Sequence, residues 1–71
     1  MKKYYINNNV QPNGDYEVHE EGCYWLSIAT NTSFLGLFYN CEDAVKEAIR
    51  QYPYRSRING CATCSYDCHT S

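Results

Sequence analysis

Soft metal ligands are concentrated near the C-terminal end of this 71-residue sequence. Cys61 and Cys64 are separated by two residues, a spacing that lets two thiolates converge on one ion at about 2.3 Å. Cys68 adds a third sulfur and His69 adds an imidazole. These residue types at this spacing are typical of a tetrahedral zinc site, and zinc is the cofactor that we predict.

We predict Cys61, Cys64 and Cys68 as zinc ligands. The fourth ligand stays open, because adjacent residues such as Cys68 and His69 seldom both reach one ion. A residue from the body of the fold could meet the tail if a strand or the start of a helix lies beside it. The candidates for the fourth position are His69, Cys23, Cys41 and His19.

The same cysteines could instead form disulfides, or remain free thiols that pack as small apolar side chains. The chain has five cysteines, so at least one sulfur is unpaired in any intramolecular disulfide scheme. In a reducing compartment, clustered cysteines bind metal more often than they form permanent disulfides. The sequence favours metal and leaves the other two states open.

Thiol chemistry is the alternative function. Cys41 is expected at the N-terminus of a helix, where the helix dipole stabilises a thiolate, and Cys61 and Cys64 have the spacing of a redox pair. However, Cys41 shares an apolar stripe with Val45 and Ala48, which favours a core position, and no helix is expected after Cys64. A thiol redox or sensor protein therefore ranks second, and we predict no catalytic residue.

A third hypothesis concerns nucleic acid. Arg50, Arg55 and Arg57 are interleaved with Tyr52 and Tyr54, as in a small surface that stacks bases and pairs with phosphates. The net charge of −2 argues against it, because general nucleic-acid binding requires a positive field. We expect a helix end followed by a solvated connector.

Three antiparallel strands are expected to form a meander in the first half of the chain. Residues 3–10 and 15–23 alternate apolar and polar side chains, and the turn-forming residues 11–14 lie between them. Residues 24–29 are apolar enough to continue the second strand, and residues 34–38 form the third. The alternation places His19 on a solvated face.

One helix is expected after the strands. Asn40 is a good N-cap, Cys41 is the first helical residue, and Pro53 ends the helix. Ile58 can open a short fourth strand before the cysteine-rich tail. The predicted fold class is therefore α+β, in the order β-β-β-α. The helix packs on the sheet through a stripe of Val45, Ala48, Ile49 and Tyr52.

Small size explains why sulfur ligation matters. Residues 1–71 form one domain, which buries only about 60% of the surface that its unfolded chain exposes. Structural zinc contributes about 10 to 16 kcal/mol in small finger peptides. We therefore expect an interaction or binding module stabilised by zinc or disulfides, compatible with a protein partner and less compatible with an enzyme.

The N-terminal residues 1–10 lack the apolar segment of a secretory signal. No run approaches the length of about 20 apolar residues that spans a bilayer. We expect a cytoplasmic protein without a membrane partner, and the oligomeric state stays open.

A string of residues spread over nearly the whole chain forms a recognisable motif pattern. Through this string, the chain resembles a family of small, functionally uncharacterised bacterial proteins. The resemblance implies a bacterial cytosolic protein and brings no activity, substrate or catalytic residue. Relatives often carry histidine where this chain has Tyr16, so that position has no histidine role here. The string comprises Tyr4-Tyr5, Asn7, Asn9, Gln11, Asn13-Gly14-Asp15, Glu17-Val18-His19, Cys23, Leu35-Gly36, Phe38, Cys41, Gly60-Cys61, Cys64 and Cys68-His69-Thr70.

Overall fold

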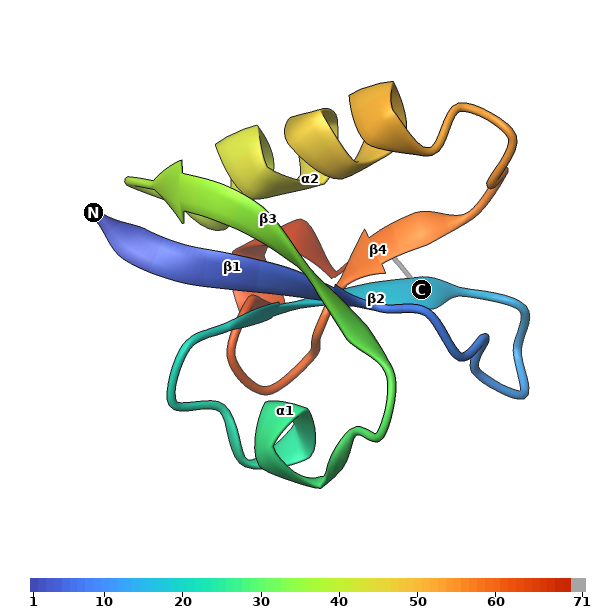
Figure 1. Ribbon diagram of the computed structural model, residues 1–71, viewed down its shortest axis with the longest axis horizontal. Coiled ribbons are helices and arrows are strands. Elements are labelled where there is room, and N and C mark those ends of the chain that lie inside the picture. The colour runs from blue at the N-terminus through green and yellow to red at the C-terminus, as the bar shows by residue number, and fades with distance from the viewer. Residues whose placement is uncertain (70–71) are drawn as a thin grey trace.

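The computed structural model describes residues 1–69 and confirms the α+β class. Figure 1 shows a twisted sheet with a helix on each side. The elements in chain order are β1 (Lys2–Asn7), β2 (Tyr16–Glu20), α1 (Tyr24–Ile28), β3 (Thr32–Phe38), α2 (Cys41–Gln51), β4 (Ile58–Gly60) and the short 3-10 helix η1 (Tyr66–Cys68).

The sheet is mixed, with the strand order β3-β1-β2-β4. Strand β1 is antiparallel to both β2 and β3, and the short strand β4 is parallel to β2. The predicted meander is therefore wrong, because β3 pairs with β1 and not with β2. The hairpin of β1 and β2 and the short fourth strand are both present.

The meander prediction failed at the segment that follows β2. We expected residues 24–29 to continue the strand, but Tyr24–Ile28 forms helix α1. Gly22 precedes it with φ of 85°, a left-handed conformation that turns the chain away from the sheet. An apolar run this short cannot be assigned to strand or helix by periodicity alone.

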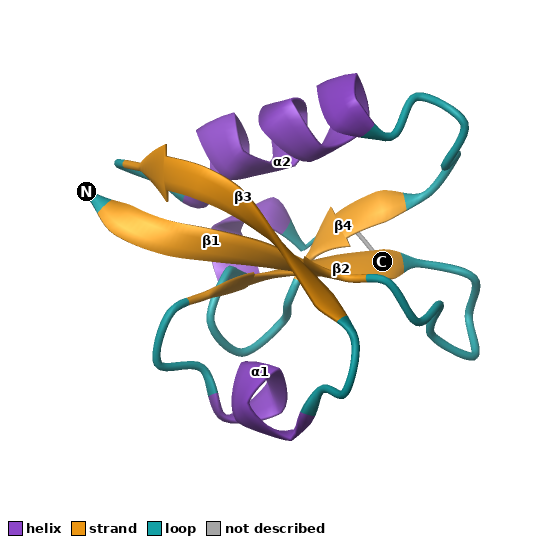
Figure 2. Ribbon diagram, viewed as in Figure 1, coloured by secondary structure: helices purple, strands orange, loops and turns teal. Residues whose placement is uncertain are grey.

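Helix α2 lies over one face of the sheet (Figure 2), and the hydrophobic core lies between them. The predicted start of α2 is confirmed, since Asn40 Oδ1 accepts a hydrogen bond from the Asp43 N–H at 3.0 Å. The predicted stripe is wrong at Ile49, which is 50% exposed, whereas Ala44 is fully buried and lets the helix approach the sheet closely. The core comprises Tyr4, Ile6, Val18, Leu35, Cys41, Ala44 and Ala48.

The opposite face of the sheet faces α1. His19 points to this side and is only 1% exposed, so the predicted solvated face is wrong at this residue. The sulfurs of Cys23 and Cys64 lie against its ring and exclude water from it. No helix among the described residues is long and apolar enough to cross a membrane.

The segment after β4 packs tightly against Gly60. The Cys61 N–H donates to the Val18 carbonyl at 3.0 Å, which continues the parallel pairing by one residue. A Cβ atom added to Gly60 would lie 2.6 Å from Cys68 Cβ and 2.7 Å from the Ser65 carbonyl oxygen. Only glycine therefore fits at position 60, where β4 ends against Ser65 and Cys68.

The substitution Gly60→Ala should destabilise the domain by about 1 to 3 kcal/mol, because the backbone of the tail must move to admit the methyl group. Urea unfolding followed by tyrosine fluorescence measures this change. Ser56→Ala, at an exposed connector position, is the control and should stay within about 0.5 kcal/mol of the parent. Equal midpoints for the two variants would contradict the tight packing.

Candidate metal centre

Four potential ligands meet on the α1 side of the sheet. His19 lies in β2, Cys23 follows that strand, and Cys61 and Cys64 follow β4. One donor atom from each side chain lies within 4.8 Å of the other three. His19, Cys23 and Cys61 are buried and Cys64 is half-buried. We call these four residues the Cys3His cluster.

The parallel pairing of β2 with β4 creates the cluster. Val18 lies opposite Gly60 in the register. The residues that follow them, His19 in β2 and Cys61 just after β4, therefore lie next to each other. The chain then turns back on itself, because the Ser65 N–H donates to the Cys61 carbonyl at 2.8 Å. This turn brings Cys64 toward the imidazole.

The spacing of the donor atoms suits a tetrahedral ion. His19 Nδ1 is 3.8 Å from Cys23 Sγ and 3.8 Å from Cys64 Sγ. A zinc ion with bonds of about 2.3 Å to sulfur and 2.0 Å to nitrogen would separate these atoms by about 3.5 Å. These two distances are within a few tenths of an ångström of that separation, and all four donor atoms lie within 4.8 Å of one another.

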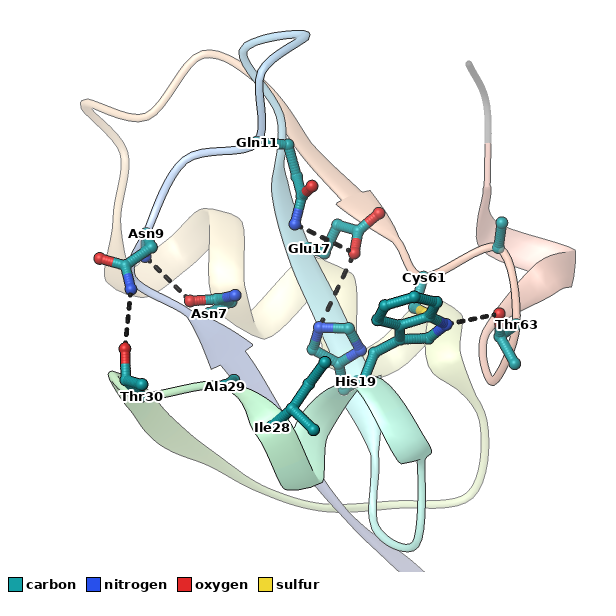
Figure 3. A pocket seen from close by; sticks show the side chains of 12 residues that line it. Asn7, Asn9, Gln11, Glu17, His19, Ile28, Ala29, Thr30, Cys61 and Thr63 are labelled. Atoms are coloured by element: carbon teal, nitrogen blue, oxygen red, sulfur yellow. Dashed lines mark hydrogen bonds and ion pairs between the residues drawn. The ribbon is translucent and has the colours of Figure 1, made fainter.

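Two groups lie next to the ligands, the Glu17 carboxylate beside His19 and the Glu20 N–H beside Cys64. The Glu17 carboxylate oxygen Oε1 lies 3.8 Å from His19 Nε2 (Figure 3), whereas the sulfurs of Cys23 and Cys64 lie 3.8 Å from Nδ1. The Glu20 N–H donates to Cys64 Sγ at 3.3 Å. A carboxylate behind a ligating imidazole and an N–H directed at a thiolate are contacts that hold metal ligands in position.

The electrostatics argue against a reactive thiol at Cys64. Burial lowers the pKa of His19, which keeps the imidazole neutral, the form that binds metal. Burial, together with the neighbouring thiol of Cys23, raises the pKa of Cys64 to about 12. Unless a cation lies beside it, Cys64 therefore stays protonated near neutral pH and is a poor nucleophile.

The cluster contains some of the predicted ligands and omits others. Cys61 and Cys64, the pair with metal-site spacing, are both present, and Cys23 and His19 come from the candidates for the fourth position. The spacing identified the tail pair. It could not show that both remaining donors come from the end of β2, because that depends on strand pairing.

Cys68 is a correction to the predicted ligand set. Its sulfur is bonded to Cys41 at 2.01 Å, so it is not a free ligand. Helix η1 turns Cys68 away from the cluster and toward the first residue of α2. His69 also lies elsewhere, with Nδ1 3.1 Å from the Gly60 carbonyl oxygen.

The three arginines of the nucleic-acid hypothesis are engaged within the chain. Arg50 and Arg57 form ion pairs with carboxylates. The Arg55 guanidinium carbon lies 4.4 Å and 4.1 Å from the ring centroids of Tyr16 and Tyr52. These contacts use the charges within the fold and leave less of them for a phosphate backbone.

An open pocket of about 580 Å³ borders the cluster. His19 and Cys61 belong both to the cluster and to the pocket wall, and Figure 3 shows their side chains there. The remaining wall consists mainly of amide, hydroxyl and apolar side chains. These are Asn7, Asn9, Gln11, Glu17, Trp25, Ile28, Ala29, Thr30, Ala62 and Thr63.

Alkylation of the denatured, unreduced protein should modify Cys23, Cys61 and Cys64 and leave Cys41 and Cys68 unmodified, because only the last two share a disulfide. Peptide mass mapping without reductant measures this pattern. As a control for peptide recovery, a second sample is fully reduced before alkylation, so that all five cysteines are modified. A bond between Cys61 and Cys64 would contradict the arrangement.

Comparison with known proteins adds no functional assignment. The chain matches no family model, no curated protein and no solved structure. Membership of the small bacterial family stays a prediction. The function is therefore argued from the geometry of the Cys3His cluster.

Proposed function

We propose that this chain is a small binding domain in which one structural zinc ion holds the C-terminal segment to the sheet. The observation that carries the proposal is the meeting of four donor atoms within 4.8 Å. Four protein ligands leave no coordination position for a substrate, which is typical of structural and not of catalytic zinc. Three sulfurs and one imidazole favour zinc over oxygen-seeking cations.

The layer on this side of the sheet needs such a crosslink. None of the residues of α1 is buried, so apolar packing contributes little to holding this helix and the adjacent loops. A metal would join Cys64 to His19, which is 45 residues earlier in the chain. The binding free energy of zinc is then available as folding free energy.

We also propose a cytoplasmic location, since three free thiols suit a reducing compartment.

The disulfide between Cys41 and Cys68 favours a second candidate function, a thiol redox protein. Cys41 is the first residue of α2, where the helix dipole stabilises a thiolate. In that case, Cys41 of the reduced protein should alkylate faster than every other cysteine.

Protein purified under reduction and without chelator should contain about one zinc per chain, measured by plasma mass spectrometry. Removal of the zinc should lower the melting temperature by more than about 10 °C, because several kcal/mol of binding free energy are lost from a domain of this size. Circular dichroism follows the melting. Adding zinc back should restore the original transition.

The variants Cys23→Ser and Cys64→Ser should each reduce zinc to well below one equivalent. The matched control is the double variant Cys41→Ser and Cys68→Ser, which removes two sulfurs outside the cluster and should keep full zinc. A folded parent without zinc, or equal zinc loss in the control, would overturn the proposal.

A further inference from the structure

We propose that the pocket beside the Cys3His cluster binds an organic cation, an alkylammonium or alkylguanidinium group. The inference rests on the proposed zinc site and extends it, because His19 and Cys61 belong to both the cluster and the pocket wall. The volume of about 580 Å³ is in the range of small-molecule sites. The pocket is open, so a free amine or a side chain of a partner could enter it.

The charge of the wall selects the class of ligand. Among the described residues that line the pocket, Glu17 is the only acidic one, and none is lysine or arginine. Three thiolates and a neutral imidazole around a divalent ion carry one net negative charge, and two of these ligands form part of the wall. A positive ligand would therefore meet two negative centres and no positive one.

Glu17 is available to such a ligand. Its side chain is 22% exposed and extends into the pocket (Figure 3). Its hydrogen bond and its ion pair both use Oε1, at 3.4 Å from Gln11 Nε2 and 3.8 Å from His19 Nε2, and His69 and Asp15 also act on its charge. Each distance is longer than a normal hydrogen bond of about 2.7 to 3.2 Å, so the carboxylate can still accept strong donors.

Helix α1 supplies an apolar wall to the same pocket. Trp25 and Ile28 are 49% and 53% exposed, although large apolar side chains gain by burial. Trp25 Nε1 donates to Thr63 Oγ1 at 3.1 Å, which fixes the indole in place. An indole face attracts a cation, and a neighbouring aliphatic side chain accommodates an alkyl stem.

The test titrates the zinc-loaded protein at pH 7.5 with three probes that share one amide backbone. These are the N-acetyl methylamides of lysine, of arginine and of norleucine, which has the four-carbon chain of lysine without the ammonium. Calorimetry should show the two cations binding at least about tenfold more tightly than norleucine, since a charge-assisted hydrogen bond is lost with the ammonium. A fourth probe, 1,5-diaminopentane, distinguishes a free amine from a side chain in an amide backbone.

Variants locate the binding. Glu17→Gln should lower the affinity for the lysine and arginine probes by at least about tenfold. Trp25→Leu should lower the same affinity by about twofold to thirtyfold. Glu42→Gln removes the same charge from the exposed first turn of α2 and should leave affinity unchanged. Zinc content is measured for every variant, so that loss of metal is not mistaken for loss of the pocket.

Two outcomes separate the proposals. The first is a parent protein that contains full zinc but binds no probe, binds norleucine as tightly as lysine, or binds cations no less tightly after Glu17→Gln. Any of these results overturns the cation site and leaves the zinc site standing. A folded parent without zinc overturns the zinc site, and the cation site fails with it because half of its negative charge is then absent.

Discussion

The parallel pairing of β2 with β4 is the contact on which the rest of the structure depends. Three paired positions place Gly60 beside Val18, and every cysteine of the tail is positioned from that point. The pairing is short, so it cannot be stable alone. The disulfide between Cys41 and Cys68 on one side of the sheet and the proposed metal site on the other would hold it. The missing side chain of Gly60 lets the tail close over it.

These two crosslinks would divide the work between the two faces. On the α2 side, apolar packing is extensive and the disulfide between Cys41 and Cys68 joins helix η1 to the core. On the α1 side, no residue of the helix is buried, and the Cys3His cluster is the main buried contact with the sheet. A chain this small thus builds one apolar core and has a cluster of sulfur and imidazole side chains in place of a second.

Local signals in the sequence predicted local structure. The cap at Asn40 and the turn at residues 11–14 identified the start of α2 and the first hairpin, because both depend on neighbouring residues. The pairing of β3 with β1 was missed, since it depends on a helix that a short apolar run does not reveal. Likewise, the burial of His19 depends in part on Cys64, a residue 45 positions away, and no periodicity encodes it.

The separation between the two halves of the cluster has a kinetic consequence. The hairpin of β1 and β2 closes a short loop, whereas β4 must find β2 across about half the chain, and such long closures are slow. We therefore expect His19 and Cys23 to be in place before Cys61 and Cys64 arrive. An ion captured early would have only two ligands and would exchange freely, so a metal bound at the cluster would fasten a nearly finished fold and would not nucleate it.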